Sequence, residues 1–550
     1  QGSPVPPSAA TMGADAPEGV SAASLSGKEP QPKPDPEPPH SRPVTPLTGS
    51  SKAPQVAKRG GPKSSAAPNL VVPTFEDTFD RPPRSLAPRV GILDRTVSAV
   101  NSFLFSIVPD VERMKRTSTG VKGLSPEDEA ASRLPKSWTA MNQKEKTKHP
   151  AKVCVIGLHG WFTQGLLKTI TGPPTGTSDR LASMCASAVH KYMRDADMEM
   201  NPEAVTVIPL TGDGKVSDRV DKFFATLISN KTWTEELRKA DAVFIVAHSQ
   251  GAPVSTHLLA RLIEQKHILP ERTQVGLLAL CGIHNGPFAH LQGNITGSYL
   301  HYFETAAAKE LFDFQSSSSA ASRQYAESLK ICFQAGGKMI YIGSVDDQVV
   351  PLYSALHSSV SHPSILRALY VDGQAFPRTD FLINLLTFCV AVRNAGTSDH
   401  GLLTLLSSSV AGSLYGGTGH SLIYDEPACY DLAVRYLFET TSPLSEPTVR
   451  KDERSPPAVQ LEPFDAQRWN PYQLPWALRG LLEDPRVRSL FSDHIIKLLE
   501  DYEQWKPVTK TLRDVQFRLQ PMTSIKRPEL PTESRKSSAS QALKKTAPKL

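Results

Sequence analysis

The stretch of sequence that decides the fold is DAVFIVAHSQGAP, residues 241–253. It opens with the run 241–247, which is almost entirely apolar, as in a strand covered on both faces of a sheet. Ala247, a variable residue, Ser249, a second variable residue and Gly251 follow. This spacing predicts a sharp turn from a strand into a helix, where flanking residues must be small because chain segments pass close together.

A turn of this kind places a serine hydroxyl at the N-terminus of a helix. We expect the Ser249 hydroxyl to be exposed there as a nucleophile, with the backbone N–H of Gln250 directed at a developing oxyanion. Ala247 departs from the glycine that is usual at the first position of the motif. So short a pattern also arises by chance, and its position between an apolar run and a helix is what makes it informative.

The surrounding chain alternates strand-like and helix-like segments from about residue 151 to 440, which predicts an α/β domain with a mostly parallel sheet. The other expected strands are apolar runs, at 152–158, 204–210, 275–283, 338–344 and 365–371. The expected helices lie between them, at 178–194, 215–229, 250–265, 300–334 and 425–438.

A serine nucleophile needs a base, and the base needs a carboxylate that orients it. The run 338–344 leads into VDDQVVP, residues 345–351, so a carboxylate stands just past the end of a strand. Asp347 has the spacing Asp-x-Val-Val-Pro, whereas Asp346 fits when the count runs forward from Gly343. We favour Asp347 as the acid and keep Asp346 as the alternative.

The base is expected after the acid in the chain. His420 lies in the glycine-rich stretch YGGTGHSLIY, residues 415–424, just ahead of the last helix, and completes the order Ser249, Asp347, His420. Two other histidines have structural interpretations. We expect His159 to order its own loop, and His248 to pack beneath the turn, because its position next to Ser249 points it elsewhere.

A second oxyanion donor is expected in the loop after the first long strand, GLHGWFTQG, residues 157–165. The His-Gly pair lets the chain turn inward there, so that the N–H of Trp161 or of Phe162 can face the oxyanion.

Together, AHSQG, LHGWF, GSVDDQVVP and GTGHSLIY resemble the α/β-hydrolase superfamily in its lipase/esterase-like branch. The arrangement also resembles a group of fungal α/β-hydrolase proteins. The resemblance covers about residues 150–440. It implies the α/β-hydrolase fold, with an eight-stranded, mostly parallel sheet and helices on both faces. It also implies a triad of Ser249, Asp347 and His420, and an oxyanion hole formed by the N–H groups of Gln250 and Trp161.

Composition predicts unstructured flanks, since 15 of the 47 prolines lie in residues 1–70. One amphipathic stretch interrupts them: apolar residues recur at three- and four-residue steps over 91–108, as on one face of a helix. This helix either docks on the main domain or contacts a membrane peripherally. The expected segments are a disordered Pro/Ser-rich part (1–90), the amphipathic helix (91–110), a linker (111–150), the hydrolase domain (151–440), a helical extension (461–520) and a disordered basic tail (521–550).

Two apolar insertions, 286–335 and 378–412, are longer than the core fold needs. They form either a helical lid lined for an acyl chain or an extra packed layer. The lid favours a serine hydrolase that cleaves a lipid-like ester or thioester. The alternatives are a catalytically silent fold that serves as a binding or tethering module, and an acyltransferase in which an alcohol replaces water.

The net charge and the lengths of the apolar stretches argue against other classes of function. A net charge of +6 from 61 basic and 55 acidic residues is too small and too mixed to predict nucleic-acid binding. The longest apolar stretch, 381–392, is too short to cross a membrane. The sequence contains no metal-ligand motif and no nucleotide-binding motif, since GGTG, residues 416–419, lacks the lysine of a phosphate-binding loop. We therefore expect no metal and no cofactor.

The six cysteines lack Cys-x-x-Cys spacing, which favours reduced core thiols and an intracellular protein, cytoplasmic or peripheral on a membrane. The chain begins with Gln1 rather than Met, so we expect the natural N-terminus to be missing, and a targeting peptide cannot be assessed.

Overall fold

The computed structural model describes residues 67–79, 134–137, 151–160, 176–198, 201–292, 306–373, 376, 381–409, 419–442, 457–468 and 470–528. The amphipathic stretch at 91–108 and most of the expected disordered flanks lie outside these residues. Trp161 and the glycines just before His420, Gly416 and Gly417, also lie outside them.

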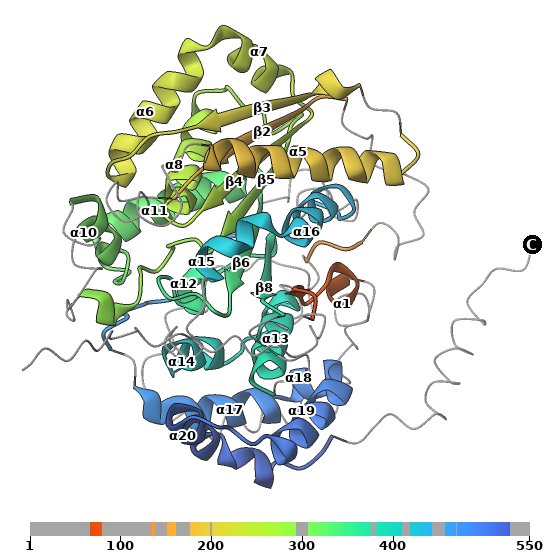
Figure 1. Cartoon of the computed structure of the whole chain (residues 1–550), viewed down its shortest axis with the longest axis vertical. Coiled ribbons are helices and arrows are strands. Elements are labelled where there is room, and N and C mark those ends of the chain that lie inside the picture. The colour runs from red at the N-terminus through yellow and green to blue at the C-terminus, as the bar shows by residue number, and fades with distance from the viewer. Residues whose placement is uncertain are drawn as a thin grey trace, which may run out of the picture. The chain divides into compact units, whose positions relative to one another are not determined.

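A seven-stranded sheet forms the centre of the described structure, in the order β1-β8-β6-β5-β4-β2-β3 (Figure 1). Every pairing is parallel except that of β1 with β8. The six strands predicted from apolar runs are all present. The strands are β1 (Leu70–Val72), β2 (Val153–Leu158), β3 (Val205–Leu210), β4 (Ala242–His248), β5 (Gln274–Leu280), β6 (Lys338–Ser344) and β8 (Ile365–Val371). A separate two-stranded pair joins β7 (Val360–Ser361) to β9 (Gln460–Leu461).

The apolar runs are continuous because both faces of the sheet are covered. In β4, Val243 and Ile245 belong to the core on one face, whereas Phe244 and Val246 belong to the core on the other. The first core is closed by α6, α8 and α11, and the second by α5 and α16. This arrangement is the mostly parallel, two-sided α/β architecture that the sequence predicts.

The helices of the main domain follow the alternation read from the sequence. They are α5 (Thr177–Asp195), α6 (Val216–Ser229), α7 (Lys231–Lys239), α8 (Gly251–Glu264), α10 (Ala306–Asp313), α11 (Ala320–Gln334), α12 (Leu352–Ala355), α15 (Gly419–Leu422) and α16 (Pro427–Phe438). Short 3₁₀ turns accompany them at Pro202–Ala204, Ala289–Gln292 and Ile423–Asp425.

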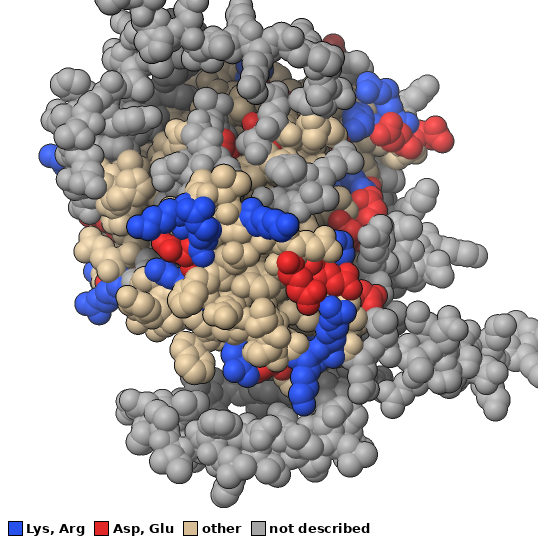
Figure 2. All heavy atoms as spheres, turned by 60° about the horizontal axis from the view of Figure 1, so that its bottom comes forward, with Lys and Arg blue, Asp and Glu red and all other residues tan. Residues whose placement is uncertain are grey.

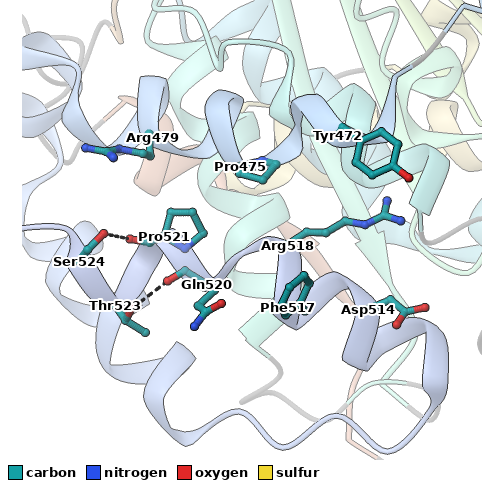
Figure 3. A pocket seen from close by; sticks show the side chains of 10 residues that line it. All are labelled: Tyr472, Pro475, Arg479, Asp514, Phe517, Arg518, Gln520, Pro521, Thr523 and Ser524. Atoms are coloured by element: carbon teal, nitrogen blue, oxygen red, sulfur yellow. Dashed lines mark hydrogen bonds between the residues drawn. The ribbon is translucent and has the colours of Figure 1, made fainter.

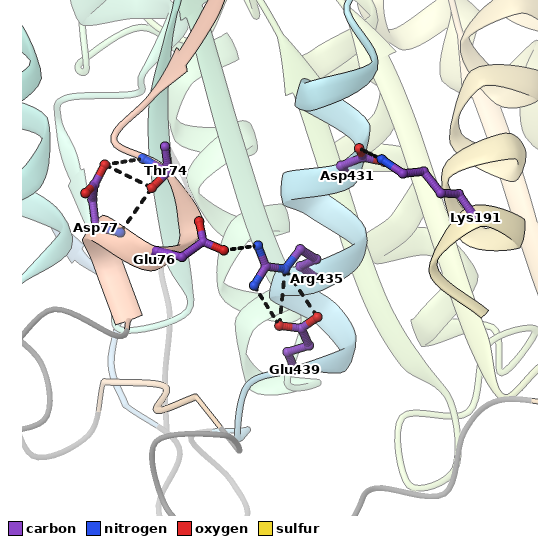
Figure 4. A network of polar contacts seen from close by, with 7 residues as sticks. All are labelled: Thr74, Glu76, Asp77, Lys191, Asp431, Arg435 and Glu439. Carbon is purple, nitrogen blue, oxygen red and sulfur yellow. Dashed lines mark hydrogen bonds and ion pairs between the residues drawn. The ribbon is translucent and has the colours of Figure 1, made fainter. Parts of the chain in front are cut away.

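The N-terminal flank corrects the expectation of disorder over residues 1–90. Residues 67–79 form β1, which extends the sheet, and α1 (Phe75–Phe79), whose apolar face packs against α16. A capping box starts α1, because the Asp77 N–H donates to the Thr74 hydroxyl and the Thr74 N–H donates to the Asp77 carboxylate. Figure 4 shows this box beside Arg435 of α16, which pairs with Glu76.

The helical extension predicted for 461–520 joins the main domain through a shared apolar core. Its helices are α17 (Leu474–Glu483), α18 (Pro485–Leu490), α19 (Ser492–Gln504) and α20 (Lys510–Arg518), with 3₁₀ turns at Pro471–Gln473 and Gln520–Ser524. They pack on α13 (Phe381–Asn394) and α14 (Leu402–Ser409), and α13 in turn packs on β8. Residues 381–409 of the second insertion therefore form an extra packed layer.

The residues expected as linker include one short contact with the main domain, a bridge between Ser137 and Thr440. All six cysteines are free and buried. Among the described helices, none combines the length and the apolar character that crossing a membrane requires.

The packing of α1 predicts that residues 67–79 are part of the cooperative core. Phe79 is 1% exposed, and its ring stacks on Tyr436 at 5.7 Å. We expect Phe79→Ala to lower the free energy of unfolding by about 3–5 kcal/mol in urea denaturation. Glu76→Gln, which removes the charge from the partly exposed ion pair with Arg435, is expected to lower it by less than about 1 kcal/mol. Equally small effects of both changes would contradict the docking of this segment.

Candidate active site

The turn between β4 and α8 has the backbone conformation that the motif predicts, but Ser249 is only 4% exposed, so the expectation of an exposed hydroxyl is wrong for the described structure. Ser249 has a φ of +56°, in the left-handed region that side-chain-bearing residues rarely occupy. Three backbone hydrogen bonds hold it there: the Ser249 N–H donates to Leu280, and its carbonyl accepts from Ala252 and Ile283. The strained residue is thus tied to β5 and to the first turn of α8.

Glycines make room for this turn against the end of β2. A Cβ atom on Gly251 would lie 2.7 Å from the His159 carbonyl oxygen and 2.8 Å from that of Leu158. A Cβ atom on Gly160 would lie 2.8 Å from the Cβ of Ser249. The small residues are therefore required by close backbone approach, and the end of β2 lies directly beside the serine.

Three predicted residues from separate elements come within hydrogen-bond distance of one another. His420, at the start of α15, has its Nδ1 atom 2.7 Å from Oδ2 of Asp347 and its Nε2 atom 3.2 Å from Oγ of Ser249. Asp347 can only accept, so the Nδ1 atom carries the proton and Nε2 is free to accept the hydrogen of the serine hydroxyl.

Asp347, rather than Asp346, makes this contact with His420, although both carboxylates are buried. The second oxygen of Asp347 accepts the N–H groups of Val349 and Val350, each at 2.8 Å. Burial alone would raise the pKa of Asp347, but the charge and hydrogen bond of His420 and the two N–H groups outweigh it and lower the pKa. A buried carboxylate held ionised in this way orients the imidazole.

His248 lies beneath the turn, as expected, and supports His420 rather than replacing it. Its Nε2–H donates to the His420 carbonyl at 2.6 Å, and its ring lies 4.7 Å from the His420 ring. Burial, followed by the nearby His420, lowers the pKa of His248 to about 3. The neutral ring therefore anchors the backbone of the histidine that faces Ser249.

His159 orders the loop after β2. Its Nδ1–H donates to the Gly160 carbonyl, and its Nε2 accepts the Gly212 N–H at 3.2 Å. Its backbone N–H donates to the Ser178 hydroxyl of α5 at 3.0 Å. Burial, with a smaller effect of the Arg219 charge, lowers the pKa of His159 to about 4. The neutral imidazole is thus a structural group, as the sequence suggested.

The expected oxyanion donor Gln250 is wholly buried at the start of α8. Its N–H stands at the N-terminus of α8, where backbone donors have no partner within the helix. The other expected donor, Trp161, lies outside the described residues.

One cluster of metal-type ligands occurs among the described residues, and it coincides with this site. Cys281, Asp347 and His420 have their ligand atoms within 4.8 Å of one another. Burial and then the Asp347 charge raise the pKa of the Cys281 thiol well above its usual value. Two members of this cluster, Asp347 and His420, are hydrogen-bonded to each other, and His420 also contacts Ser249.

A large open groove lies elsewhere, on the helical extension. It has a volume of about 760 Å³ and is lined by residues that include Tyr472, Phe517 and Arg518, none of them a predicted site residue (Figure 3). Figure 2 turns this end of the molecule toward the viewer and shows basic and acidic side chains around an uncharged area. The groove is therefore separate from the Ser249 site.

A model of the YMC0/YMC35 alpha/beta hydrolase domain matches residues 130–485. No curated protein is similar enough in sequence to count as a match. Among solved structures, "Phospholipase PlaB from Legionella pneumophila" is 15% identical with a TM-score of 0.24, over 35% of this chain and 39% of that chain. This chain thus spans well under half of PlaB. A structure reported with the metagenome-derived lipolytic enzymes LipS and LipT is 15% identical with a TM-score of 0.24, over 40% of this chain and 86% of that one.

The lowered pKa of Asp347 predicts a pH-dependent contribution to stability. An aspartate whose pKa is lower in the folded chain stabilises it above the unfolded value of about 3.9, and this contribution is lost as pH falls through the folded value. We therefore expect the stability difference between wild type and Asp347→Asn to be largest above about pH 5 and to shrink under acid.

Urea unfolding between pH 3 and 7 measures this difference. As a control, Asp221→Asn breaks an exposed pair with Arg261 and should change the free energy of unfolding by less than about 1 kcal/mol. A difference for Asp347→Asn that grows on acidification would show that the carboxylate is not held ionised.

Proposed function

Because the chain belongs to the YMC0/YMC35 alpha/beta hydrolase family, we propose that it is a serine hydrolase that cleaves a lipid-like ester or thioester. The observation that carries the proposal is the continuous hydrogen-bonded series from Ser249 through His420 to the buried Asp347. Such a series supplies a nucleophile, a general base and an orienting anion in one place.

The geometry supports a two-step acyl transfer. The Nε2 atom of His420 takes the proton of Ser249 as Oγ attacks the carbonyl carbon, and negative charge develops on the carbonyl oxygen. The N–H of Gln250, with that of Trp161 as the expected second donor, donates a hydrogen bond to that oxygen and stabilises its charge. As the ester bond breaks, His420 returns the proton to the leaving alcohol or thiol. Water then attacks the acyl-serine by the same route and releases the acid.

Asp347 stabilises the imidazolium that forms in each step. Its hydrogen bond to Nδ1 also keeps Nε2 facing Ser249, so loss of the charge affects both tautomer and orientation. The strained conformation of Ser249 also favours one direction of attack. Three backbone hydrogen bonds fix the main chain of Ser249, and the main chain sets the direction of its Cα–Cβ bond.

Labelling with a fluorophosphonate probe tests the nucleophile. We expect wild type to be labelled at Ser249 and Ser249→Ala to be unlabelled, because only an activated serine attacks the probe at a useful rate. Ser255→Ala is the matched control: this buried serine of α8 donates only to the Ala252 carbonyl, and its loss should leave labelling unchanged. A folded wild-type protein that does not react would contradict the enzyme and favour a silent binding module.

The two acid candidates predict opposite kinetic results. We expect Asp347→Asn to reduce kcat about 10⁴-fold on an activated ester, and Asp346→Asn to reduce it far less, because only Asp347 contacts His420. Circular dichroism confirms that both variants are folded. A larger loss in the Asp346 variant would reassign the acid.

The lipid-like substrate is tested by p-nitrophenyl esters from C2 to C16. Because residues 381–409 form a packed layer, the expectation of an acyl-binding site rests on the first apolar insertion, 286–335. If that insertion lines such a site, kcat/KM should rise with chain length, by up to about tenfold for every two buried methylene groups. A rate that does not rise with chain length would exclude an acyl-binding site and leave a small ester as the substrate.

A further inference from the structure

Arg219 is a buried cation that the sequence did not single out. It lies in the first turn of α6, is 0% exposed, and packs its guanidinium 5.1 Å from the centre of the Phe223 ring. Burial lowers its pKa to about 10, so the group is still charged at neutral pH. Its hydrogen bonds to described residues run to neutral oxygens, and the charge of Asp213 offsets the effect of burial on its pKa only in part.

Those two acceptors belong to the two segments expected to form the oxyanion hole. One terminal nitrogen donates to the Gln250 side-chain oxygen at 2.8 Å, and the other donates to the His159 carbonyl at 2.7 Å. Gln250 follows the nucleophile, and His159 follows β2, which leads into the Trp161 loop. A single rigid guanidinium therefore joins two chain segments that are about ninety residues apart.

The amide of Gln250 completes the connection. Arginine can only donate, so the amide oxygen must face Arg219, and the amide nitrogen is left to donate to the Gly214 carbonyl at 3.0 Å. Both ends of the side chain are thus held by the loop and first turn of α6. The N-terminus of α6 is itself held, because the Val216 N–H donates to Glu310.

Packing alone does not account for a charge at this position. Burying a cation costs several kcal/mol, and an apolar side chain of similar volume would fill the space without that cost. What an apolar side chain cannot provide is two directed hydrogen bonds from one planar group. The guanidinium thus holds Gln250 and His159 at a set separation.

We propose that Arg219 is a positioning residue for the oxyanion hole of the proposed serine hydrolase, on which this inference rests. Its guanidinium holds the Gln250 side chain and the His159 carbonyl at a fixed separation, so that the backbone N–H of Gln250 keeps its direction toward the oxyanion. Rigid placement matters because donors help only if they already point to where charge develops. Lysine offers no planar fork and cannot reproduce both contacts.

The test compares Arg219→Lys and Arg219→Met with wild type on one activated ester. We expect kcat to fall roughly 10–100-fold in both variants, and KM to change less than about twofold. This loss of kcat is somewhat smaller than the loss expected when an oxyanion donor itself is removed. A trifluoromethyl ketone, which forms a tetrahedral adduct with serine, should lose affinity by the same factor as kcat/KM. Guanidinium ion at millimolar concentration should partly restore Arg219→Ala.

Arg367→Met is the matched control for the loss of a buried arginine. Arg367 is also buried and donates to the carbonyls of Leu356, His357 and Val360, away from the turn at Ser249. We expect this change to lower stability but to leave kcat per labelled Ser249 close to wild type. Dividing rates by the number of labelled sites removes unfolded protein from the comparison.

Gln250→Met tests the route of the effect, since it removes the side-chain acceptor but keeps the backbone N–H. If Arg219 acts through Gln250, the double variant should be little slower than the slower single variant. If Arg219→Met has the same kcat per labelled site as wild type, the inference about Arg219 fails and the hydrolase proposal stands. Absence of labelling in wild type would overturn the hydrolase itself, so the two failures are distinguishable.

Discussion

The left-handed conformation of Ser249, wedged between the ends of β4 and β2, is the constraint on which the site depends. With φ at +56°, the chain leaves the sheet and enters α8 within two residues, and a Cβ on Gly251 would collide with the carbonyl oxygens of Leu158 and His159. The two strands are neighbours at the point where strand order reverses, with β2 between β4 and β3. The carboxyl ends of parallel strands at such a point are where α/β proteins assemble sites.

Polar groups packed around the turn share the task of holding it. His248 anchors the backbone of His420, the two N–H groups after Asp347 hold its carboxylate, and Arg219 ties Gln250 to the end of β2. Each is buried, and burial keeps the histidine neutral and the hydrogen bonds strong. A strained nucleophile and a rigid buried network belong together, because strain persists only where surrounding structure over-determines it.

Much of the fold follows from local pattern, and the misses have physical causes. The six long strands were predictable because burial on both faces imposes continuous apolar runs of about six or seven residues. β1 has only three residues, Leu70–Val72, and follows a proline-rich flank, so composition hid it. The signal available in this segment was the capping box at Thr74 and Asp77, which marks the start of α1 rather than β1.

For the site, the sequence by itself determined the turn at Ser249 and the order of serine, carboxylate and histidine, because tight turns and strand ends impose local spacing. The tertiary structure decided which of Asp346 and Asp347 contacts His420, because neighbouring residues in a loop point in different directions and Asp347 is the one that reaches it. It also brought Arg219 into contact with Gln250 and His159, which lie just before α8 and just after β2. Contacts between residues far apart in the chain are set by packing, which spacing along the sequence does not encode.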